Sequence, residues 1–323
     1  MRAFEAYRGV EALVLGGGGF VGTWVAATLV HAGASVTVSA RNREAALAAL
    51  ARHGVRCDVR VFDLAHPGEA TRLLSALRPA IVFNLAGYGV DPSERDEALA
   101  ARINTELVRE LAENVQAQSS WRGQSLVHAG SALEFGEQHG DFADAWTCRP
   151  TTLYGRSKLA GSEALRDASR RRGMRALTAR LFTVYGPGEH PGRLLPTLLR
   201  ARASDDAIPL TAGLQLRDFT SVGDIAHGLL RLGALHETLA ERALNLATGR
   251  LTSVREFVET AADELGLARE RLQFGALPTR VEEMSHAPVS IRALEAALGW
   301  KPSTTVRQGL REALAFERRS AGT

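Results

Sequence analysis

The N-terminal half of the chain alternates short apolar runs with longer segments whose apolar residues recur at helical spacing. The short runs, with β-branched cores such as Val-Thr-Val and Ile-Val-Phe, predict strands at 12–15, 35–39, 56–62, 80–85, 125–129 and 176–182. The longer segments predict helices at 19–32, 43–53, 69–77, 94–116 and 153–172. Strands separated by helices form parallel sheets that are covered on both faces. The pattern therefore predicts an α/β fold of the Rossmann type, with a doubly wound parallel sheet.

The rhythm changes after residue 188, where prolines interrupt the regular pattern. A helix is predicted at 194–203, another sheet strand at 243–246, and a helix at 252–266 that opens on Ser253 with Glu256 three residues later. We interpret residues 1–185 and 217–248 as the Rossmann domain. Residues 186–216 and 249–316 then form a smaller, mixed α/β C-terminal cap.

Composition narrows the class of protein. With 323 residues and 45% apolar content, the chain is too apolar to be disordered. The 39 Lys and Arg residues exceed the 36 Asp and Glu residues by only +3, so a nucleic acid is not expected as a partner. The two cysteines, Cys57 and Cys148, have no metal-site spacing, and no metal site is predicted.

One stretch has the length and lack of charge of a membrane span, residues 12–30. It contains five glycines, four of them consecutive, and its pattern changes from strand to helix partway. We interpret it as a strand–turn–helix and expect no membrane segment. The first nine residues contain charges and no apolar run, so no signal peptide is predicted and a cytoplasmic location is expected.

The glycines of this stretch form the first candidate binding motif. Gly16, Gly19 and Gly22 have the spacing G-x-x-G-x-x-G, directly after a predicted strand and at the start of a helix. Glycine permits the tight turn and lets backbone N–H groups, those of Phe20 and Val21 among them, approach a pyrophosphate at the positive end of the helix. The motif predicts a dinucleotide cofactor.

The end of the second strand indicates which dinucleotide is preferred. A carboxylate usually binds the free ribose hydroxyls of NAD(H) about 20 residues after the glycines. Here the residues are Ala40, Arg41, Asn42 and Arg43, with no acid, and an arginine offers planar charged donors to a 2′-phosphate. We therefore expect NADP(H) in preference to NAD(H), with NAD(H) as the alternative.

A second cofactor contact is predicted after the third strand, at Asp63 and Leu64. The Asp63 carboxylate is either an acceptor for the adenine amine or a cap for the next helix. Leu85, Ala86 and Gly87 follow the fourth strand and supply small residues where a nicotinamide ribose must pass.

The pair Tyr154 and Lys158 carries the candidate chemistry. Residues four apart on a helix share a face, one turn apart. A phenol has a reference pKa near 10, and a neighbouring ammonium, together with the charge of an oxidised nicotinamide, is expected to lower the pKa of Tyr154. Only two residues of the chain are lysines, Lys158 and Lys301, which makes this placement informative. Ser131 ends another predicted strand at the ligand-binding edge of the sheet, where its hydroxyl can donate to a substrate carbonyl.

Taken together, these motifs resemble those of the extended short-chain dehydrogenase/reductase family, in the branch of nucleotide-sugar epimerases, dehydratases and reductases. The resemblance covers nearly the whole chain, and its later blocks are 180–188, 217–224 and 298–302. It implies that Tyr154 is the general acid/base, that Lys158 tunes it and binds ribose, and that Ser131 polarises the reacting oxygen. It also implies that Asn104 belongs to a proton relay.

The resemblance further implies a substrate site. Arg217 matches the arginine that binds a sugar-nucleotide diphosphate, and Arg280 is either a second clamp from the cap or a surface residue. Thr183 stands where the family usually has asparagine, so it departs from the pattern at the nucleotide site. His190 is either a substrate-site acid or base or a surface loop residue. A homodimer is implied, through a bundle of the helices near 94–116 and 153–172.

Two absences narrow the reaction. Ala132 and Leu133 occupy the positions of the acid pair of sugar-nucleotide dehydratases, and Glu134 comes one position too late, so dehydration is not expected. Leu133 also replaces the cysteine of some epimerases. The leading hypothesis is an NADPH-dependent reductase of a keto group on a nucleotide-activated sugar, such as a 4-keto-6-deoxyhexose. The alternatives are a 4-epimerase with retained cofactor, a reductase of a non-sugar ketone or aldehyde and, in a different class, a non-catalytic cofactor-binding regulator.

Overall fold

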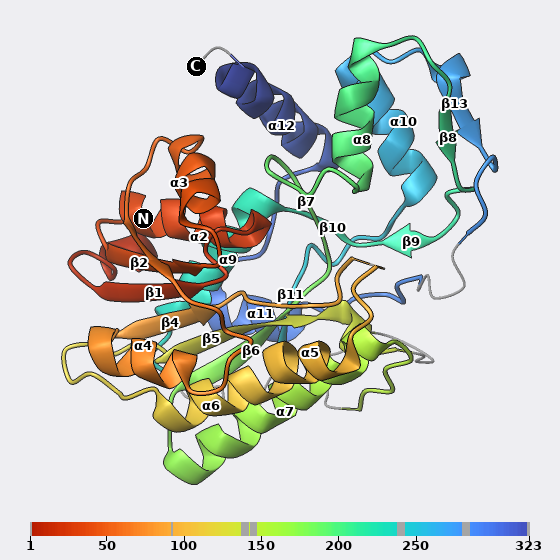
Figure 1. The fold of residues 1–323 in the computed structure, drawn as a ribbon. Helices are drawn as coiled ribbons and strands as arrows, with labels where there is room; N and C mark the ends of the chain where they lie inside the picture. Colours follow the sequence, from red (N-terminus) through yellow and green to blue (C-terminus); the bar gives the residue numbers. More distant parts are fainter. Residues whose placement is uncertain are drawn as a thin grey trace.

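The computed structural model describes residues 2–91, 93–136, 142, 147–237, 243–279 and 285–321. Its centre is a seven-stranded sheet in the order β11–β6–β5–β4–β1–β2–β3, in which every neighbouring pair is parallel (Figure 1). The strands are β1 (Glu11–Leu15), β2 (Ser35–Ala40), β3 (Asp58–Val61), β4 (Ile81–Asn84), β5 (Leu126–Ser131), β6 (Ala176–Leu181) and β11 (Ala243–Leu246). This confirms the predicted Rossmann-type sheet. The strand order reverses direction between β1 and β4, which is the point where such sheets bind ligands.

Helices cover both faces of the sheet, as its buried apolar strands require. One face packs against α2 (Phe20–His31), α3 (Arg43–Ala51), α9 (Val222–Gly233) and α11 (Arg292–Leu298), with α1 (Arg2–Glu5) beside α9. The other face packs against α4 (Glu69–Leu77), α6 (Leu107–Asn114) and α7 (Leu153–Arg172). Two separate apolar clusters result, one on each face.

The helix predicted at 94–116 differs from the observed one. The helical run begins at α5 (Glu97–Ala101), where Asp96 caps it by accepting from the Leu99 N–H, and ends with α6 at Asn114. Between α5 and α6 lies one π-helical segment, Arg102–Glu106. The wider turn places Asn104 and Thr105 against α7, where both bind Ser157.

The predicted helix at 252–266 also starts later than expected. Thr252–Ser253 forms the short strand β12, which pairs with β9 (Leu216–Arg217), and α10 runs from Val254 to Leu265. Ser253 is its N-cap and accepts from the Glu256 N–H at 3.1 Å. The predicted N-cap is confirmed. Thr252 and Ser253 pair with β9 instead of forming the first helical turn.

Beyond the sheet, a smaller group of elements shares its own apolar cluster. It contains β7 (Thr183–Tyr185), α8 (Leu194–Arg200) with the 3₁₀ turn Ala201–Ala203, β8 (Ile208–Leu210), β10 (Phe219–Ser221), α10, the 3₁₀ turn Arg269–Arg271, β13 (Leu272–Phe274) and α12 (Val306–Ala321). Figure 1 shows α8, α10 and α12 on one side of the main sheet, with β8 and β13 at the outer edge. We call this group the cap. The domain boundaries stay a prediction, and α11 packs on the sheet rather than in this cluster.

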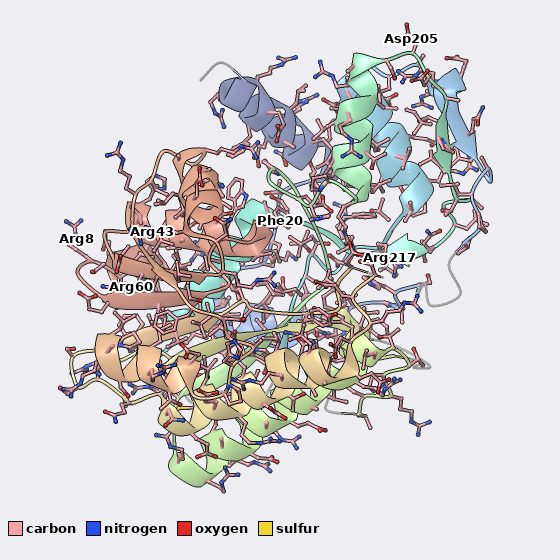
Figure 2. All side chains as sticks on the ribbon, viewed as in Figure 1. Arg8, Phe20, Arg43, Arg60, Asp205 and Arg217 are labelled. Carbon is pink, nitrogen blue, oxygen red and sulfur yellow. The ribbon has the colours of Figure 1, made fainter. Side chains whose placement is uncertain are left out.

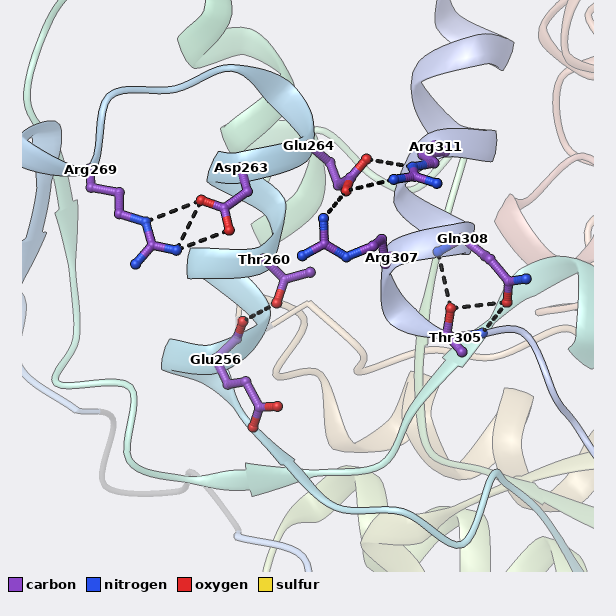
Figure 3. A network of polar contacts seen from close by, with 9 residues as sticks. All are labelled: Glu256, Thr260, Asp263, Glu264, Arg269, Thr305, Arg307, Gln308 and Arg311. Carbon is purple, nitrogen blue, oxygen red and sulfur yellow. Dashed lines mark hydrogen bonds and ion pairs between the residues drawn. The ribbon is translucent and has the colours of Figure 1, made fainter.

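Helix α12 connects the cap to the Rossmann sheet layer. Figure 3 shows Arg307 and Arg311 of α12 directed at Glu264 of α10, with Arg311 Nε 2.7 Å from the carboxylate. At its other end, Phe316 packs against Trp24 of α2 and His53. Trp24 also donates from Nε1 to the Pro187 carbonyl at 2.9 Å, so the loop after β7 is tied to α2.

The uncharged stretch at 12–30 is divided between β1, a glycine turn and the 12-residue helix α2. Within the part of the chain that the structure describes, no helix combines the length and apolarity needed to cross a bilayer.

Candidate active site

The candidate site lies along the carboxyl ends of three adjacent strands, β5, β4 and β1. Ser131 is the last residue of β5, residues 85–87 follow β4, and Gly16 follows β1. Parallel strands end at one edge of the sheet, so the structure brings together residues that are up to 115 positions apart. The predicted catalytic serine and the predicted cofactor residues therefore share one edge.

The glycine turn between β1 and α2 leaves no room for side chains. Gly16 has φ +71°, and a Cβ on it would lie 2.9 Å from the backbone of Leu85 and Ala86. A Cβ on Gly22 would lie 2.1 Å from the Gly16 carbonyl oxygen. The first turn of α2 has no side-chain cap, so its N–H groups remain available at the positive end of the helix. This cradle fits the pyrophosphate of a dinucleotide cofactor.

The residues predicted around the adenine end have different roles in the structure. Arg41 is exposed after β2, whereas Asn42 caps α3 by accepting from the Ala45 N–H at 2.9 Å. The Arg43 guanidinium donates to the Val59 carbonyl, so part of it serves the packing of α3 on β3. Figure 2 shows Arg43 and Arg60 on this edge of the sheet. Of these three residues, Asn42 and Arg43 have structural roles at α3, which leaves Arg41 as the best candidate ligand for a phosphate.

Asp63 and Leu64 follow β3. Asp63 accepts from the Ala65 N–H at 3.0 Å and does not cap the next helix, because α4 begins later with Gly68 as its N-cap. The helix-cap alternative is therefore wrong. The Leu64 side chain is buried in the apolar cluster under α4 and α6, which leaves only its backbone for a ligand.

Tyr154 and Lys158 lie on the first two turns of α7, whose N-cap Thr152 accepts from the Gly155 N–H at 3.0 Å. A Cβ on Gly155 would lie 2.3 Å from the Leu133 carbonyl oxygen, so only glycine lets α7 approach the turn after Ser131 this closely. As a result the Ser131 side chain lies close enough to the Tyr154 phenol to lower its pKa. Lys158, 2% exposed, lies one turn further along the same face.

The electrostatics of this trio differ from the sequence-based expectation. Burial raises the pKa of the Tyr154 phenol above its usual value, and the Glu134 carboxylate raises it further, while the hydrogen bond with Ser131 opposes the rise. Burial also lowers the pKa of Lys158 to about 8, with Glu134 acting in the opposite direction. The predicted acidification of Tyr154 by Lys158 is therefore wrong for the cofactor-free protein. Desolvation is the largest cause of both shifts, and the phenol is protonated at neutral pH.

Sequence reasoning missed the charged pair behind this trio. The Arg180 Nε of β6 lies 2.8 Å from the Glu134 carboxylate, and both side chains are 0% exposed. Glu134 comes from the 3₁₀ turn Ala132–Glu134, and its side chain is buried inside the protein. A signal was available, because Arg180 lies within an otherwise apolar predicted strand and a buried guanidinium requires an anionic partner.

Asn104 is fully buried in the π-helical segment. Its Nδ2 donates to the Tyr88 carbonyl at 2.7 Å and to Ser157 Oγ at 2.9 Å, and its Oδ1 accepts from the Tyr88 N–H at 3.0 Å. These bonds join the loop after β4 to α7, on which Tyr154 lies. The relay role stays a prediction, and the contacts give Asn104 a positioning role.

Arg217, the predicted diphosphate ligand, ends β9, which pairs with β12 just before α10 of the cap. Burial of the His286 imidazole, and to a smaller extent the nearby Arg217 charge, lowers the pKa of His286 to about 3. The next residue, Asp218, is fully buried and accepts from the N–H groups of Thr248, Gly249 and Arg250, so it fixes the backbone that presents Arg217. Figure 2 shows Arg217 on the side of the cap that faces the sheet layer.

Three further residues were predicted at the substrate site: Thr183, His190 and Arg280. Thr183 begins β7 and donates its N–H to the Asp218 carbonyl at 3.0 Å. His190 is exposed, and its Nδ1 accepts from the Gly192 N–H at 3.3 Å. Arg280 lies outside the described residues. Near His190, the Glu189 side chain is only 7% exposed and pairs with Arg193, a buried carboxylate that sequence reasoning missed.

Comparisons with known proteins agree with this geometry. A model of the NAD dependent epimerase/dehydratase family matches residues 12–247. The dTDP-6-deoxy-L-talose 4-dehydrogenase (NAD(P)(+)) of Kitasatospora kifunensis is 30% identical over an alignment of 320 positions, which covers 93% of this chain and 93% of that protein. The dTDP-L-rhamnose 4-epimerase of Burkholderia thailandensis is 27% identical over an alignment of 346 positions, which covers 94% of this chain and 94% of that protein.

Among solved structures, MoeE5 in complex with UDP-glucose and NAD is 27% identical, with a TM-score of 0.78. The match covers 96% of this chain and 99% of that chain. The relatives therefore include enzymes named for oxidation and for epimerisation at sugar carbon 4, and the same fold carries both kinds of activity.

Proposed function

Because the chain belongs to the NAD dependent epimerase/dehydratase family and is an NAD(P)-dependent enzyme of the extended short-chain dehydrogenase/reductase type, we propose that it reduces a keto group on a nucleotide-activated sugar. The substrate that we propose is an NDP-4-keto-6-deoxyhexose, and the reductant is NADPH. A relative named as a 4-dehydrogenase, similar over 93% of both chains, supports the position of the carbonyl.

The observation that carries the proposal is the closeness of Ser131 to Tyr154 at the carboxyl end of β5, with no acid at the two positions directly after the serine. A reduction needs a proton donor for the carbonyl oxygen and a group that stabilises its developing negative charge. The protonated Tyr154 phenol donates the proton, and the Ser131 hydroxyl donates a hydrogen bond to the same oxygen. Ala132, Leu133 and the inward-facing Glu134 offer no acid–base pair for elimination of water.

When bound, the nicotinamide cofactor supplies the hydride. The residues that would bind it are the glycine turn at 16–22, the segment 85–87 and Lys158, whose ammonium can hydrogen-bond a ribose. Arg217 from β9 is the residue that we propose for the substrate diphosphate, since a guanidinium matches phosphate oxygens.

The test is the stoichiometry of turnover on a panel of dTDP-, UDP-, GDP- and CDP-linked 4-keto sugars. A reductase consumes one NADPH for each hydroxyl sugar formed, which absorbance and chromatography measure together. Isomerisation without loss of reduced cofactor would identify a 4-epimerase instead. Turnover of simple ketones or aldehydes, with no binding of any nucleoside diphosphate, would remove the sugar substrate from the proposal.

The preference for NADPH depends on Arg41 in our proposal. Arg41→Ser is expected to weaken NADPH binding by about 10- to 100-fold, because charge-assisted hydrogen bonds contribute about 1.5–3 kcal/mol. NADH binding is expected to change little. Arg60→Ser at the same edge is the matched control, because Arg60 is paired with Asp58 at 2.6 Å. An equal NADPH-to-NADH affinity ratio in the parent and Arg41→Ser would contradict this assignment.

We also propose a homodimer formed through α6 and α7, which lie side by side on one face of the sheet. The family resemblance implies this arrangement, and a mass in solution of twice 34.7 kDa by light scattering is the expected result.

A further inference from the structure

The pair formed by Glu134 and Arg180 is the most completely buried charged contact beside the candidate site. Both side chains are 0% exposed, and Arg180 also contacts Cys148 Sγ at 3.3 Å and lies over the Phe135 ring at 4.6 Å. Burying two charges costs several kcal/mol for each ion, and their attraction offsets this only with good geometry and further hydrogen bonds. An apolar pair of similar volume would be as stable, so stability alone does not account for these residues.

The Glu134 carboxylate has bonds that reach the catalytic serine. Its Oε1 accepts from the Ser131 backbone N–H at 2.9 Å and from Ser162 Oγ of α7 at 3.0 Å. Ser131 in turn caps the 3₁₀ turn that carries Glu134, which completes a reciprocal capping box. A Cβ on Gly130 would lie 2.6 Å from Glu134 Oε1, so a glycine is required for this approach. One carboxylate therefore joins the end of β5, α7 and β6.

The same carboxylate acts on the two titrating groups of the site. It raises the pKa of Lys158, against the burial that lowers it, and it raises the pKa of Tyr154. An anion beneath both groups favours the charged form of a lysine and the neutral form of a phenol. These are the protonation states that a proton-donating tyrosine and a ribose-binding lysine need.

We propose that Glu134, bound by Arg180, is a positioning residue that fixes the Ser131 hydroxyl and maintains Lys158 as an ammonium and Tyr154 as a phenol. The part concerning Tyr154 as proton donor rests on the proposed function. The part concerning Lys158 rests on the burial of Glu134 and on its hydrogen bond with Ser162, which lies one turn beyond Lys158 on α7, and it can be tested without any substrate.

Other titratable groups lie near Tyr154 and Lys158, and their effects on the two pKa values must be separated from that of Glu134. His128 of β5 is fully buried, and its Nδ1 accepts from Asn84 Nδ2 at 3.1 Å. Burial and the Lys158 charge lower the pKa of His128 far enough to keep it neutral. Tyr154 also faces Glu94 from the loop after β4, which raises its pKa, and Arg193 from the cap, which lowers it. Glu134 is thus the anion that acts on both Tyr154 and Lys158.

The test uses the scarcity of lysine in this chain. Protein labelled with ¹³C at lysine Cε gives two side-chain signals, from Lys158 and from the exposed Lys301. A pH titration of the cofactor-free protein is expected to show Lys158 losing its proton near pH 8. In Glu134→Gln the midpoint is expected to move down by about one pH unit, because a neighbouring opposite charge is lost. Lys301 is the internal reference and stays unchanged.

Glu134→Gln leaves Arg180 buried without its anion and is expected to be less stable, so a second variant is needed. Glu134→Gln/Arg180→Met removes both charges and is expected to fold with a Lys158 midpoint that is still below that of the parent. Glu134→Asp keeps the charge and is expected to restore most of the shift. Ser162→Ala removes one hydrogen bond to Glu134 but no charge, and its midpoint is expected to match the parent.

A second readout is the affinity for NADPH as a function of pH. The parent affinity is expected to fall as pH rises through about 8, and that of the double variant is expected to fall at lower pH. At pH 8 the double variant should bind about fivefold more weakly than the parent, and at pH 6 equally well. A merely structural role would weaken binding by the same factor at every pH.

An unchanged Lys158 midpoint in Glu134→Gln and in Glu134→Gln/Arg180→Met would overturn the proposal. A shift of the same size in Ser162→Ala would also overturn it. These outcomes are independent of the reaction, because the titration contains neither substrate nor cofactor. Failure to reduce any keto sugar would remove the proposed function and leave the Lys158 result standing.

Discussion

Replacing Tyr154 with phenylalanine is expected to lower kcat by about 10²- to 10⁴-fold, the usual contribution of a positioned general acid. The ring remains to fill the space beside Ser131, and only the proton donor is lost. The expected reason is specific to this environment. Burial and Glu134 keep the phenol protonated, so it is ready to donate when the carbonyl oxygen gains charge.

Single-turnover oxidation of NADPH by a keto sugar measures this effect, and fluorescence titration of NADPH separates it from cofactor binding, which should change by only a few fold. Tyr7→Phe is the matched control. Tyr7 is a buried tyrosine whose hydroxyl donates to the Leu230 carbonyl at 2.6 Å, in the layer formed by α1 and α9. That variant is expected to lose about 1 kcal/mol of stability and no activity. A Tyr154→Phe protein that reduces the substrate at the parent rate would refute the mechanism.

The second large effect is expected at the glycine turn, where Gly22→Ala should weaken NADPH binding by about 100-fold or more. The new Cβ would lie 2.1 Å from the Gly16 carbonyl oxygen and 2.8 Å from the Gly17 Cα. Both neighbours are backbone atoms, so the turn itself must move away from the start of α2. Loss of two charge-assisted hydrogen bonds to a pyrophosphate accounts for a change of this size.

Calorimetric titration with NADPH checks this prediction, and the melting temperature without cofactor reports how far the fold is affected. Gly223→Ala is the control, because Gly223 also lies in the first turn of a helix, α9, and its Cβ would meet only atoms at 3.6 Å or more. That variant is expected to bind NADPH as the parent does. Parent-like affinity in Gly22→Ala would place the cofactor phosphates elsewhere.

The elements that sequence patterns predicted well are those whose signal is local. The strands at 12–15 and 243–246 and the helices at 69–77 and 153–172 match the structure within one residue, because each is a short buried run or a periodic segment. The glycine turn was also predictable, since its residues are adjacent along the chain. The π-helical segment at Arg102–Glu106 was not, because it depends on contacts of Asn104 and Thr105 with α7.

In the candidate site, too, some features were predictable from local spacing and others depended on tertiary packing. Spacing along one helix placed Tyr154 and Lys158 on a common face, and this needs only the helical period. The sign of their pKa shifts was a tertiary property, because it depends on how much water the fold removes and on which charges it brings close. Sequence reasoning counted the attraction between the two groups and could not count their desolvation.

The amino-acid sequence by itself determined the parallel α/β sheet, the cofactor turn and the face shared by phenol and ammonium, since each follows from residues close together in the chain. Only the tertiary structure decided that Glu134 pairs with Arg180, 46 residues away, beneath that face. It also decided that Asp218 binds residues 248–250 and so fixes Arg217. Buried charges select partners across the core, and the distances that decide between partners exist only once the strands and helices have packed.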